Sequence, residues 1–250
     1  MNTNSSDYWE KFWVNRSNSG SQNDLVFQKI SHEKIYEKMK ECERLLVIGC
    51  GDGDGIELYG KKALEIVGID FSASAIRKSR SRFKQHAFYV SDITDTKLGS
   101  GNFDAIISER CITNLVTPES QLAALNEVNR LLTPDGTFYL CEPTLSGYDQ
   151  VDDLRTSLGL PVLKRHWHNL LFDDDLISRS GMHIARTQNF GIYTLISRII
   201  HPLYVYPDEP KFDGKMNTIA YEMCKVAFNY GVSLPSQHTL YTIYKVQHHG

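Results

Sequence analysis

Four glycines alternate with other residues directly after a short apolar run: Leu45–Ile48 is followed by Gly49, Gly51, Gly53 and Gly55. An apolar run of this length that ends in glycines predicts a buried strand and a tight turn. Glycine permits sharp turns and lets another group approach the backbone closely. In a doubly wound sheet such a loop faces the crevice where ligands bind. The loop therefore predicts an α/β fold with a ligand site at its strand ends.

Short apolar runs alternate with helical patterns on both sides of this loop. Ser72 and Thr117 are suited to begin helices, and Pro134-Asp135-Gly136 is suited to stop one. Strands joined by short helical connections form a parallel sheet with helices on both faces. The expected helices include 56–63, 72–85 and a helix from 118, and the expected strands are 45–48, 65–69, 88–90, 105–107, 137–141, 183–190 and 239–246.

The chain is expected to form one domain, because none of its peripheral segments is long enough to carry a core of its own. Its expected parts are an N-terminal arm and helix (1–41), a core (42–146), a helical and aromatic cap on the substrate side (147–182 and 191–234) and the last strands (183–190 and 239–246).

Composition excludes several classes of protein. The chain has 27 basic and 30 acidic residues and a net charge of −3, which argues against a nucleic-acid partner. No apolar run is long enough for a membrane span, and the first residues lack a signal pattern. Five cysteines without a CxxC pair suit reduced thiols in the cytoplasm, and Asp173–Asp175 is expected to begin a helix. We expect a cytoplasmic protein without a metal site, and the sequence does not indicate its oligomeric state.

The glycine spacing narrows the choice of ligand. Asp70 follows Gly49 by twenty-one residues at the end of the second expected strand, where a carboxylate can accept hydrogen bonds from ribose hydroxyls. The dinucleotide pattern needs its third glycine at position 54, which is Asp54, and no P-loop Gly-Lys-Ser/Thr follows. A nicotinamide-dependent oxidoreductase is therefore disfavoured, although it remains the alternative of another class.

Five segments occur in the order typical of one enzyme class: LLVIGCGDGDG (45–55), VGIDFSASAI (67–76), FYVSDIT (88–94), FDAIISER (103–110) and LLTPDGTFYL (131–140). In these segments the sequence resembles the class I S-adenosylmethionine-dependent methyltransferases. The resemblance implies a Rossmann-like, doubly wound, mostly parallel seven-stranded sheet with an antiparallel last strand. It also implies S-adenosyl-L-methionine as cofactor and S-adenosyl-L-homocysteine as product.

The resemblance also implies roles for individual residues around the cofactor. The glycines of the loop would pass beneath its methionine portion, and Asp70 would take the ribose hydroxyls. Family members usually carry an acidic residue where this chain has Val47, which makes a methyltransferase-like subunit without catalysis a further alternative. The implied cofactor-binding residues are Gly49, Gly51, Gly53, Asp70, Phe71 beside the adenine, Asp92 and Ile93 at its amino edge, and Ser108 and Glu109 near the sulfonium.

The N-terminal arm carries Tyr8, Trp9, Phe12 and Trp13 within an otherwise polar stretch. Aromatic faces stabilise cations, so Tyr8 and Trp13 are expected to border the sulfonium if the arm folds over the cleft. The alternative is that these rings only anchor the arm by burial.

The residues and the chemistry expected at the acceptor end of the site are inferred from a second resemblance. Glu109-Arg110-Cys111 and the run His166-Trp167-His168-Asn169 are similar to segments of methyltransferases from bacterial surface-polysaccharide gene clusters. That similarity implies transfer to a hydroxyl or phosphate-type oxygen of a small polar acceptor, such as a sugar nucleotide or a phosphorylated capsule precursor. N-methylation of a small metabolite or amino sugar is the alternative.

A hydroxyl acceptor needs a general base, because its own pKa lies far above neutrality. His168 is the predicted base, with Glu109 and Arg110 lining the acceptor pocket and His201 as the next candidate. We expect the substrate-binding residues to be Arg110, His166, Trp167 and Asn169.

Overall fold

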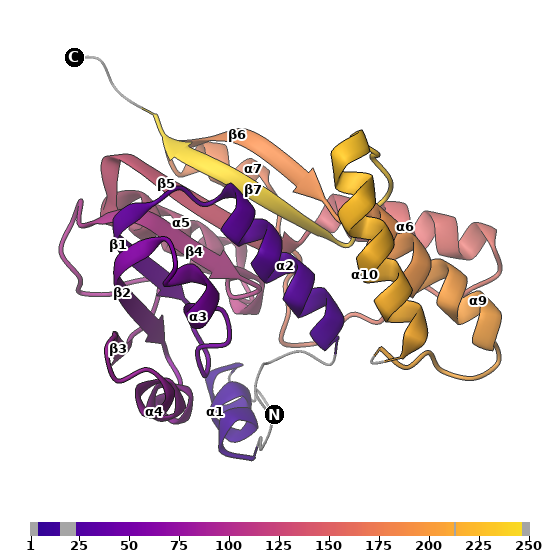
Figure 1. The fold of residues 1–250 in the computed structure, drawn as a ribbon, viewed down its shortest axis with the longest axis horizontal. Coiled ribbons are helices and arrows are strands. Elements are labelled where there is room, and N and C mark those ends of the chain that lie inside the picture. The colour runs from indigo at the N-terminus through magenta and orange to yellow at the C-terminus, as the bar shows by residue number, and fades with distance from the viewer. Residues whose placement is uncertain (1–4, 16–23, 213, 247–250) are drawn as a thin grey trace.

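The computed structural model describes residues 5–15, 24–212 and 214–246 around a seven-stranded sheet of order β3-β2-β1-β4-β5-β7-β6 (Figure 1). β7 is antiparallel to β5 and β6, and the other pairs are parallel. The expected fold class is confirmed. The strands are β1 (Cys42–Ile48), β2 (Ala63–Asp70), β3 (Ala87–Val90), β4 (Phe103–Glu109), β5 (Leu132–Pro143), β6 (Met182–Asn189) and β7 (His238–Lys245).

Helices cover both faces of the sheet. Figure 1 shows α2 in front of the sheet, with α5 and α7 behind it. Ser72 and Thr117 cap α4 and α5 as expected, since each side chain accepts a hydrogen bond from a backbone N–H of the first turn. The helices on the sheet are α2 (Leu25–Lys38), α3 (Ile56–Tyr59), α4 (Ala73–Arg82), α5 (Pro118–Leu131) and α7 (Asp175–Arg179).

The hydrophobic core has two parts, one on each side of the sheet. Alternate residues of β1 divide between them: Leu45 and Val47 pack with α2 and α3, whereas Leu46 and Ile48 pack with α5 and α7. Central parallel strands are buried on both faces, so they appear in sequence as continuous apolar runs. This burial fixes the strand ends from which the glycine loop and the site residues project.

The largest differences from the expected elements lie in three places. The N-terminal arm contains a helix, α1 (Ser5–Asn15), in a polar stretch for which the sequence predicted no helix. The helix expected over 56–63 ends at Tyr59, because Gly60 forms its C-cap and the chain enters β2 at Ala63. β5 begins at Leu132, and its partners on β4 shift register where the Pro134-Asp135-Gly136 segment passes.

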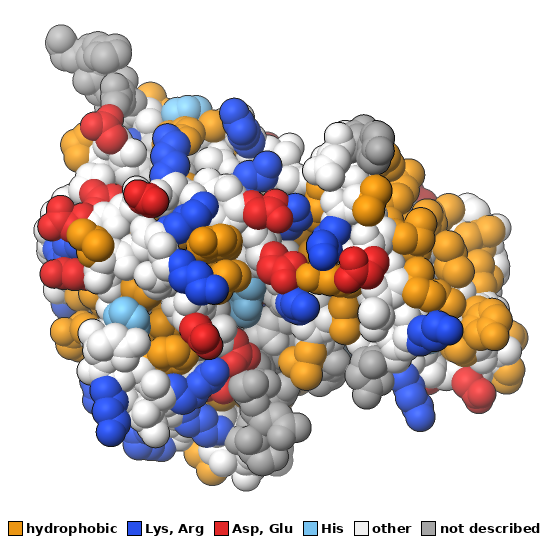
Figure 2. Space-filling view, viewed as in Figure 1, with side chains coloured by type: hydrophobic (Ala, Val, Ile, Leu, Met, Phe, Trp, Pro, Cys, Tyr) orange, Lys and Arg blue, Asp and Glu red, His pale blue; other side chains and the backbone are white. Residues whose placement is uncertain are grey.

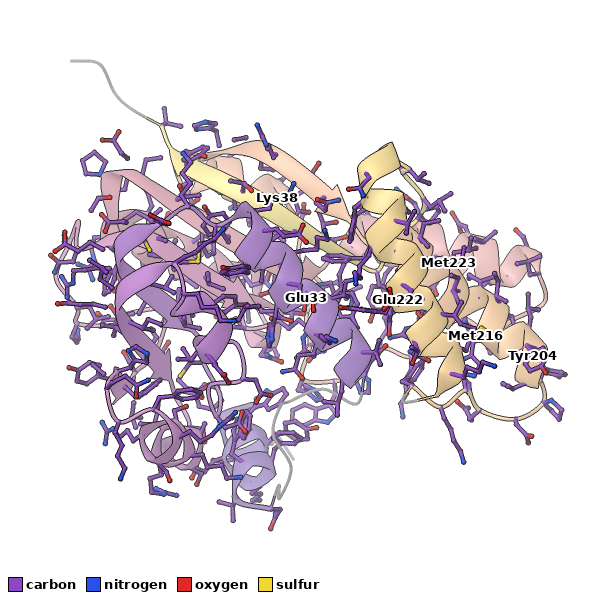
Figure 3. The ribbon with its side chains drawn as sticks, viewed as in Figure 1. Glu33, Lys38, Tyr204, Met216, Glu222 and Met223 are labelled. Atoms are coloured by element: carbon purple, nitrogen blue, oxygen red, sulfur yellow. The ribbon has the colours of Figure 1, made fainter. Side chains whose placement is uncertain are left out.

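A helical lobe extends beyond the ends of β6 and β7, on the right of Figure 1. α10 packs on α2, where the Tyr221 hydroxyl donates to the Glu33 carboxylate at 2.7 Å, and Figure 3 shows Glu33 on the α2 face toward α10. Exposed apolar side chains such as Tyr204 and Met223 gather on its outer face (Figures 2 and 3). The lobe consists of α6 (Leu145–Ser157), α8 (Gly191–Thr194), the π-helical turn η2 (Leu195–Ile200), α9 (His201–Val205) and α10 (Lys215–Ala227).

No helix among the residues that the structure describes has the length and hydrophobicity of a membrane span.

Candidate functional site

A cavity of about 340 Å³ lies at the carboxyl ends of β1, β2 and β4. This is the edge of a doubly wound sheet at which ligands bind. Trp9 and Trp13 of the arm and Arg110 complete its walls. The predicted cofactor residues that line it are Gly49, Asp70, Phe71, Asp92, Ile93 and Glu109.

The glycine loop is held in a conformation that only glycine adopts readily. Gly49 and Gly51 have φ angles of +61° and +55°. A Cβ atom on Gly49 would lie 2.6 Å from Cys111 Sγ, and one on Gly51 would lie 2.7 Å from the Trp13 ring. Both glycines are thus required for their φ angles and for the close approach of neighbouring side chains.

Asp70 links this loop to the cavity. Its carboxylate accepts hydrogen bonds from the backbone N–H groups of Gly51 at 3.0 Å and Ser72 at 2.9 Å, and the side chain lines the cavity. Burial raises the pKa of Asp70 to about 6, against the opposing effect of these two hydrogen bonds. Asp70 therefore titrates closer to neutrality than an exposed aspartate.

Helix α1 docks on the start of α4 and places aromatic rings over the glycine loop. The Glu10 carboxylate accepts hydrogen bonds from the Ser72 and Ser74 hydroxyls and from the Ser74 N–H. A carboxylate is favoured at a helix N-terminus by the exposed N–H groups and the helix dipole. Trp13 is buried against Gly51 as a result.

The arm also meets the segment that carries the predicted substrate residues. The Tyr8 ring stacks on His168 with centroids 4.3 Å apart, and it meets Trp167 edge-on at 5.6 Å. Trp9, which lines the cavity, meets His168 edge-on at 5.6 Å, and His166 lies 5.5 Å from His168. Tyr8, His166, Trp167 and His168 thus form one aromatic cluster, which joins the cavity wall through Trp9.

Three polar atoms in this cluster and next to it are buried without a hydrogen-bond partner among the described residues: Trp9 Nε1, His168 Nδ1 and Asn169 Oδ1. Burial and the neighbouring His166 hold the pKa of His168 below its ordinary value. A neutral imidazole with an unpartnered nitrogen can accept a proton.

Glu109 forms a buried ion pair that the sequence did not reveal. Its Oε2 lies 2.8 Å from His32 Nε2 on α2, and the Ser31 hydroxyl donates to Oε1 at 2.5 Å. Burial opposes the charge on Glu109, but His32 and Arg110 hold its pKa below the usual value; Glu109 in turn raises the pKa of His32 despite burial. The pair also lines a smaller adjoining cavity of about 50 Å³, together with Gly51.

Glu142 is a second residue that sequence reasoning missed. It is fully buried at the end of β5, and its carboxyl group accepts from the N–H groups of Cys111 at 3.0 Å, Ile112 at 2.9 Å and Thr113 at 3.4 Å. Burial raises the pKa of Glu142 to about 8. Glu142 therefore fixes the loop after β4 whose residues line the cavity.

Nine predicted site residues do not line the larger cavity: Tyr8, Gly51, Gly53, Ser108, His166, Trp167, His168, Asn169 and His201. Ser108 is fully buried, and a Cβ on Gly53 would meet Phe83 rather than an open space. His201 lies at the start of α9 in the helical lobe, with Nδ1 buried and unpartnered among the described residues. The carboxylates of Asp173–Asp175 are exposed at the start of α7.

Residues 46–140, which run from β1 into β5 and carry the glycine loop, match the family described as a methyltransferase domain. These residues are similar to a methyltransferase domain, and the sheet around them is the mostly parallel seven-stranded sheet expected from the resemblance to class I S-adenosylmethionine-dependent methyltransferases. The eEF1A lysine and N-terminal methyltransferase of Mus musculus is 28% identical over 148 residues, 55% of this chain. Those residues are 21% of the mouse protein, so the match spans about a fifth of that relative.

Two solved structures show the same fold over nearly the whole chain. A Haloferax volcanii methyltransferase in complex with the Trm112 methyltransferase activator has a TM-score of 0.62 at 14% identity, and covers 96% of this chain and 98% of its own. The N-methyltransferase NodS of Bradyrhizobium japonicum, in complex with S-adenosylhomocysteine, has a TM-score of 0.61 at 12% identity and covers 98% and 100%. The likeness extends through the helical lobe.

The cavity fits S-adenosylmethionine by the chemistry of its walls. It offers the Asp70 carboxylate, apolar surface from Phe71 and Ile93, and the ring faces of Trp9 and Trp13. A ribose, an adenine and a sulfonium cation require such groups.

Proposed function

We propose that the protein transfers a methyl group from S-adenosylmethionine to an oxygen of a small polar acceptor, such as a sugar nucleotide or a capsule precursor. The observation that carries this proposal is the aromatic cluster beside the cavity, in which His168 Nδ1 is buried without a partner among the described residues. Flat aromatic walls suit a sugar ring, and a neutral imidazole suits a hydroxyl acceptor.

The cofactor is assigned to the 340 Å³ cavity. Asp70 would accept from the ribose hydroxyls, Phe71 and Ile93 would enclose the adenine, and Asp92 would accept from its amino group. Trp13 and Glu109 would border the sulfonium, with the Glu109 carboxylate held by His32. Bound S-adenosylmethionine supplies the methyl group and leaves as S-adenosylhomocysteine.

The residues of the chain then have two tasks at the acceptor. His168 takes the proton of the acceptor hydroxyl while the oxygen–carbon bond forms, and Arg110 and Trp167 orient the acceptor. Helix α1 and the cap segment 147–182 exclude water, which would otherwise compete as a nucleophile. Trp9 lines the cavity and contacts His168, so it lies between the proposed cofactor site and the proposed base.

The test is methyl transfer from labelled S-adenosylmethionine to a panel of sugar nucleotides, sugar phosphates and amino sugars. With a hydroxyl acceptor, His168→Ala should lower kcat by roughly 10²–10⁴-fold, the usual range for loss of a positioned base, and leave S-adenosylhomocysteine binding intact. His183→Ala, at an exposed site on β6, is the control. A nicotinamide cofactor that binds in place of S-adenosylhomocysteine would overturn the proposal.

N-methylation is the second candidate, because the solved structure of NodS is that of an N-methyltransferase. An unprotonated amine needs no general base. Turnover of an amino sugar with little loss in His168→Ala would favour this candidate. Binding of S-adenosylhomocysteine without turnover of any acceptor would favour a subunit that has lost catalysis.

A further inference from the structure

A group of polar and cationic side chains lies around Arg198, next to the start of β7. Arg198, on η2, donates from Nε to Gln237 at 2.7 Å and from Nη2 to Asp24 at 2.7 Å. Its guanidinium also lies 4.2 Å from the centroid of the Phe212 ring. Arg198 is thus held in one orientation by three different segments of the chain.

The positions of His238 and Phe27 show that this group lies at the edge of the sheet that also carries the cavity. His238 begins β7 opposite Pro143 of β5, and its ring lies 4.3 Å from Phe27. Burial and the nearby charges of Arg110 and Arg198 hold the pKa of His238 well below its ordinary value. Both arginines therefore act on one imidazole, and Arg110 also lines the cofactor cavity.

Tyr148 of α6 joins the same group. Gln237, which accepts from Arg198, also contacts the Tyr148 hydroxyl, and the charge of Arg198 acts on this phenol. The Arg165 guanidinium lies 4.5 Å from the centroid of the Tyr148 ring. Because Arg165 directly precedes His166, this contact connects the cationic group to the aromatic cluster.

The carboxyl groups nearby are already engaged. Asp24 accepts from Arg198 Nη2, from the Tyr193 hydroxyl at 2.6 Å and from the Phe27 N–H at 3.0 Å. Glu142 accepts three backbone N–H groups. Arg198 Nη1 is nevertheless buried with no hydrogen-bond partner among the described residues. A buried guanidinium nitrogen without an acceptor is unfavourable unless a ligand supplies one.

We propose that Arg198, together with the Tyr148 hydroxyl that shares its partner Gln237, binds an anionic group of the acceptor, a phosphate or a carboxylate. A planar guanidinium whose other nitrogens are fixed by Gln237 and Asp24 presents Nη1 in a defined direction, which suits the oxygens of such a group. The inference rests on the proposed methyl transfer and specifies its substrate class as anionic small molecules.

The test measures anion binding separately from cofactor binding. S-adenosylhomocysteine is titrated first by calorimetry; inorganic phosphate, acetate and neutral glycerol are then titrated into the saturated full-length protein. The variants are Arg198→Lys, which keeps a cation beside Asp24 but removes Nη1, and Tyr148→Phe. Arg186→Gln, at an exposed position on the edge strand β6, is the matched control for the loss of a surface charge.

Phosphate or acetate should bind the wild-type protein, and glycerol should not. Arg198→Lys should weaken the preferred anion about tenfold or more, as expected for loss of one charge-assisted hydrogen bond, and Arg186→Gln should leave it unchanged. The anion that binds with the higher affinity identifies the acceptor group as phosphate or carboxylate.

Equal anion affinity in Arg198→Lys and wild type, or no anion binding to the cofactor-saturated protein, would overturn the inference. Failure of S-adenosylhomocysteine to bind would instead overturn the proposed function. If Arg198→Lys does not fold, Tyr148→Phe decides, because it removes only a hydroxyl: unchanged anion affinity in that variant would count against the assigned subsite.

Discussion

Two buried carboxyl groups at the strand ends, Glu109 and Glu142, have pKa values shifted in opposite directions, and their surroundings account for this difference. Glu109 is paired with His32, which holds its pKa below the usual value. Glu142 accepts its hydrogen bonds from backbone N–H groups, and burial raises its pKa to about 8 despite these bonds and the charge of Arg110. An opposite charge compensates for the loss of hydration, and backbone dipoles alone compensate only in part. One carboxylate thus keeps its charge at the cavity wall, while the other fixes a loop.

Asp70 should give cofactor binding a pH dependence. With a pKa of about 6 it is ionised at pH 7 and mostly protonated at pH 5, and only the carboxylate accepts well from ribose hydroxyls. We expect the affinity for S-adenosylhomocysteine to fall about tenfold from pH 7 to pH 5 in calorimetric titrations.

Two variants make this prediction specific. Asp70→Asn should bind more weakly at pH 7 and lose the slope between pH 5 and pH 7. Asp153→Asn, at an exposed position of α6, should retain the wild-type profile. A wild-type dissociation constant that is the same at both pH values would exclude Asp70 from the ribose site.

Because of the raised pKa of Glu142, the protein should become less stable as the pH rises. Its pKa is raised in the folded state, so the folded protein holds a proton that the unfolded chain releases above its ordinary pKa of 4.5. The free energy of unfolding should therefore fall by about 1.4 kcal/mol per pH unit from this group up to pH 8, and no further above it.

Urea unfolding from pH 5 to pH 9 measures this contribution. Glu142→Gln preserves a carbonyl acceptor for the loop without a titrating proton, so its stability should change less with pH than that of the wild type. Glu142→Ala should be destabilised at every pH, because it leaves buried N–H groups without an acceptor. Parallel pH profiles for Glu142→Gln and wild type would contradict this account.

At the scale of elements, helix α1 acts as a cover over the cavity rather than as part of the core. It is attached mainly through Glu10 at the start of α4 and through Trp13 over Gly51. Removal of residues 1–15 should abolish turnover and leave the sheet folded, because both core clusters lie beneath other helices. Circular dichroism during heating and a methyl-transfer assay measure the two effects.

Two point variants of α1 test whether its contact with α4 matters for activity, as distinct from the presence of the helix. Glu10→Gln weakens the contact with α4, so it should raise KM for S-adenosylmethionine with little change in melting temperature. Lys11→Gln, exposed on α1, should have no effect. Near-normal activity of the truncated protein would show that α1 only anchors the arm.

The elements that the sequence predicted well are those whose limits are set locally. Buried strands ended by glycine or aspartate, and helices begun by Ser72 and Thr117, follow from patterns within a few residues. α1 was missed because its first turn is serine-rich and its apolar face acquires meaning only when the helix lies on α4. Tertiary contact, rather than propensity, decides whether such a segment is helical.

The parts of the site that could not be predicted depend on contacts between distant segments. Ser31 and Glu109 are separated by 78 residues, and Arg198 and Asp24 by 174. A sequence can show that Asp70 follows a strand. It gives no spacing rule for two side chains that meet only because α2 packs against the helical lobe. Aromatic contacts such as Tyr8 with His168 are equally nonlocal.

For the molecule as a whole, Asp24 joins the sheet to the helical lobe. Its carboxylate caps α2, accepts from the Tyr193 hydroxyl of α8 and pairs with Arg198 of η2. These contacts connect the front helix of the sheet to the lobe that supplies part of the proposed acceptor site. Loss of Asp24 should therefore lower the stability of the protein and also loosen the attachment of the lobe to α2.

We expect Asp24→Ala to lower the free energy of unfolding by about 3–5 kcal/mol, because it leaves Arg198 buried without its partner. Thr117→Ala, which removes the cap of α5 without breaking an ion pair, should cost only about 1 kcal/mol. Urea unfolding of both variants separates the cost of a lost cap from that of an uncompensated charge. Limited proteolysis should cut Asp24→Ala first within residues 191–232, since the lobe loses its attachment to α2. Equal destabilisation of the two variants would mean that Asp24 acts only as a cap and that the lobe is held by its apolar contacts alone.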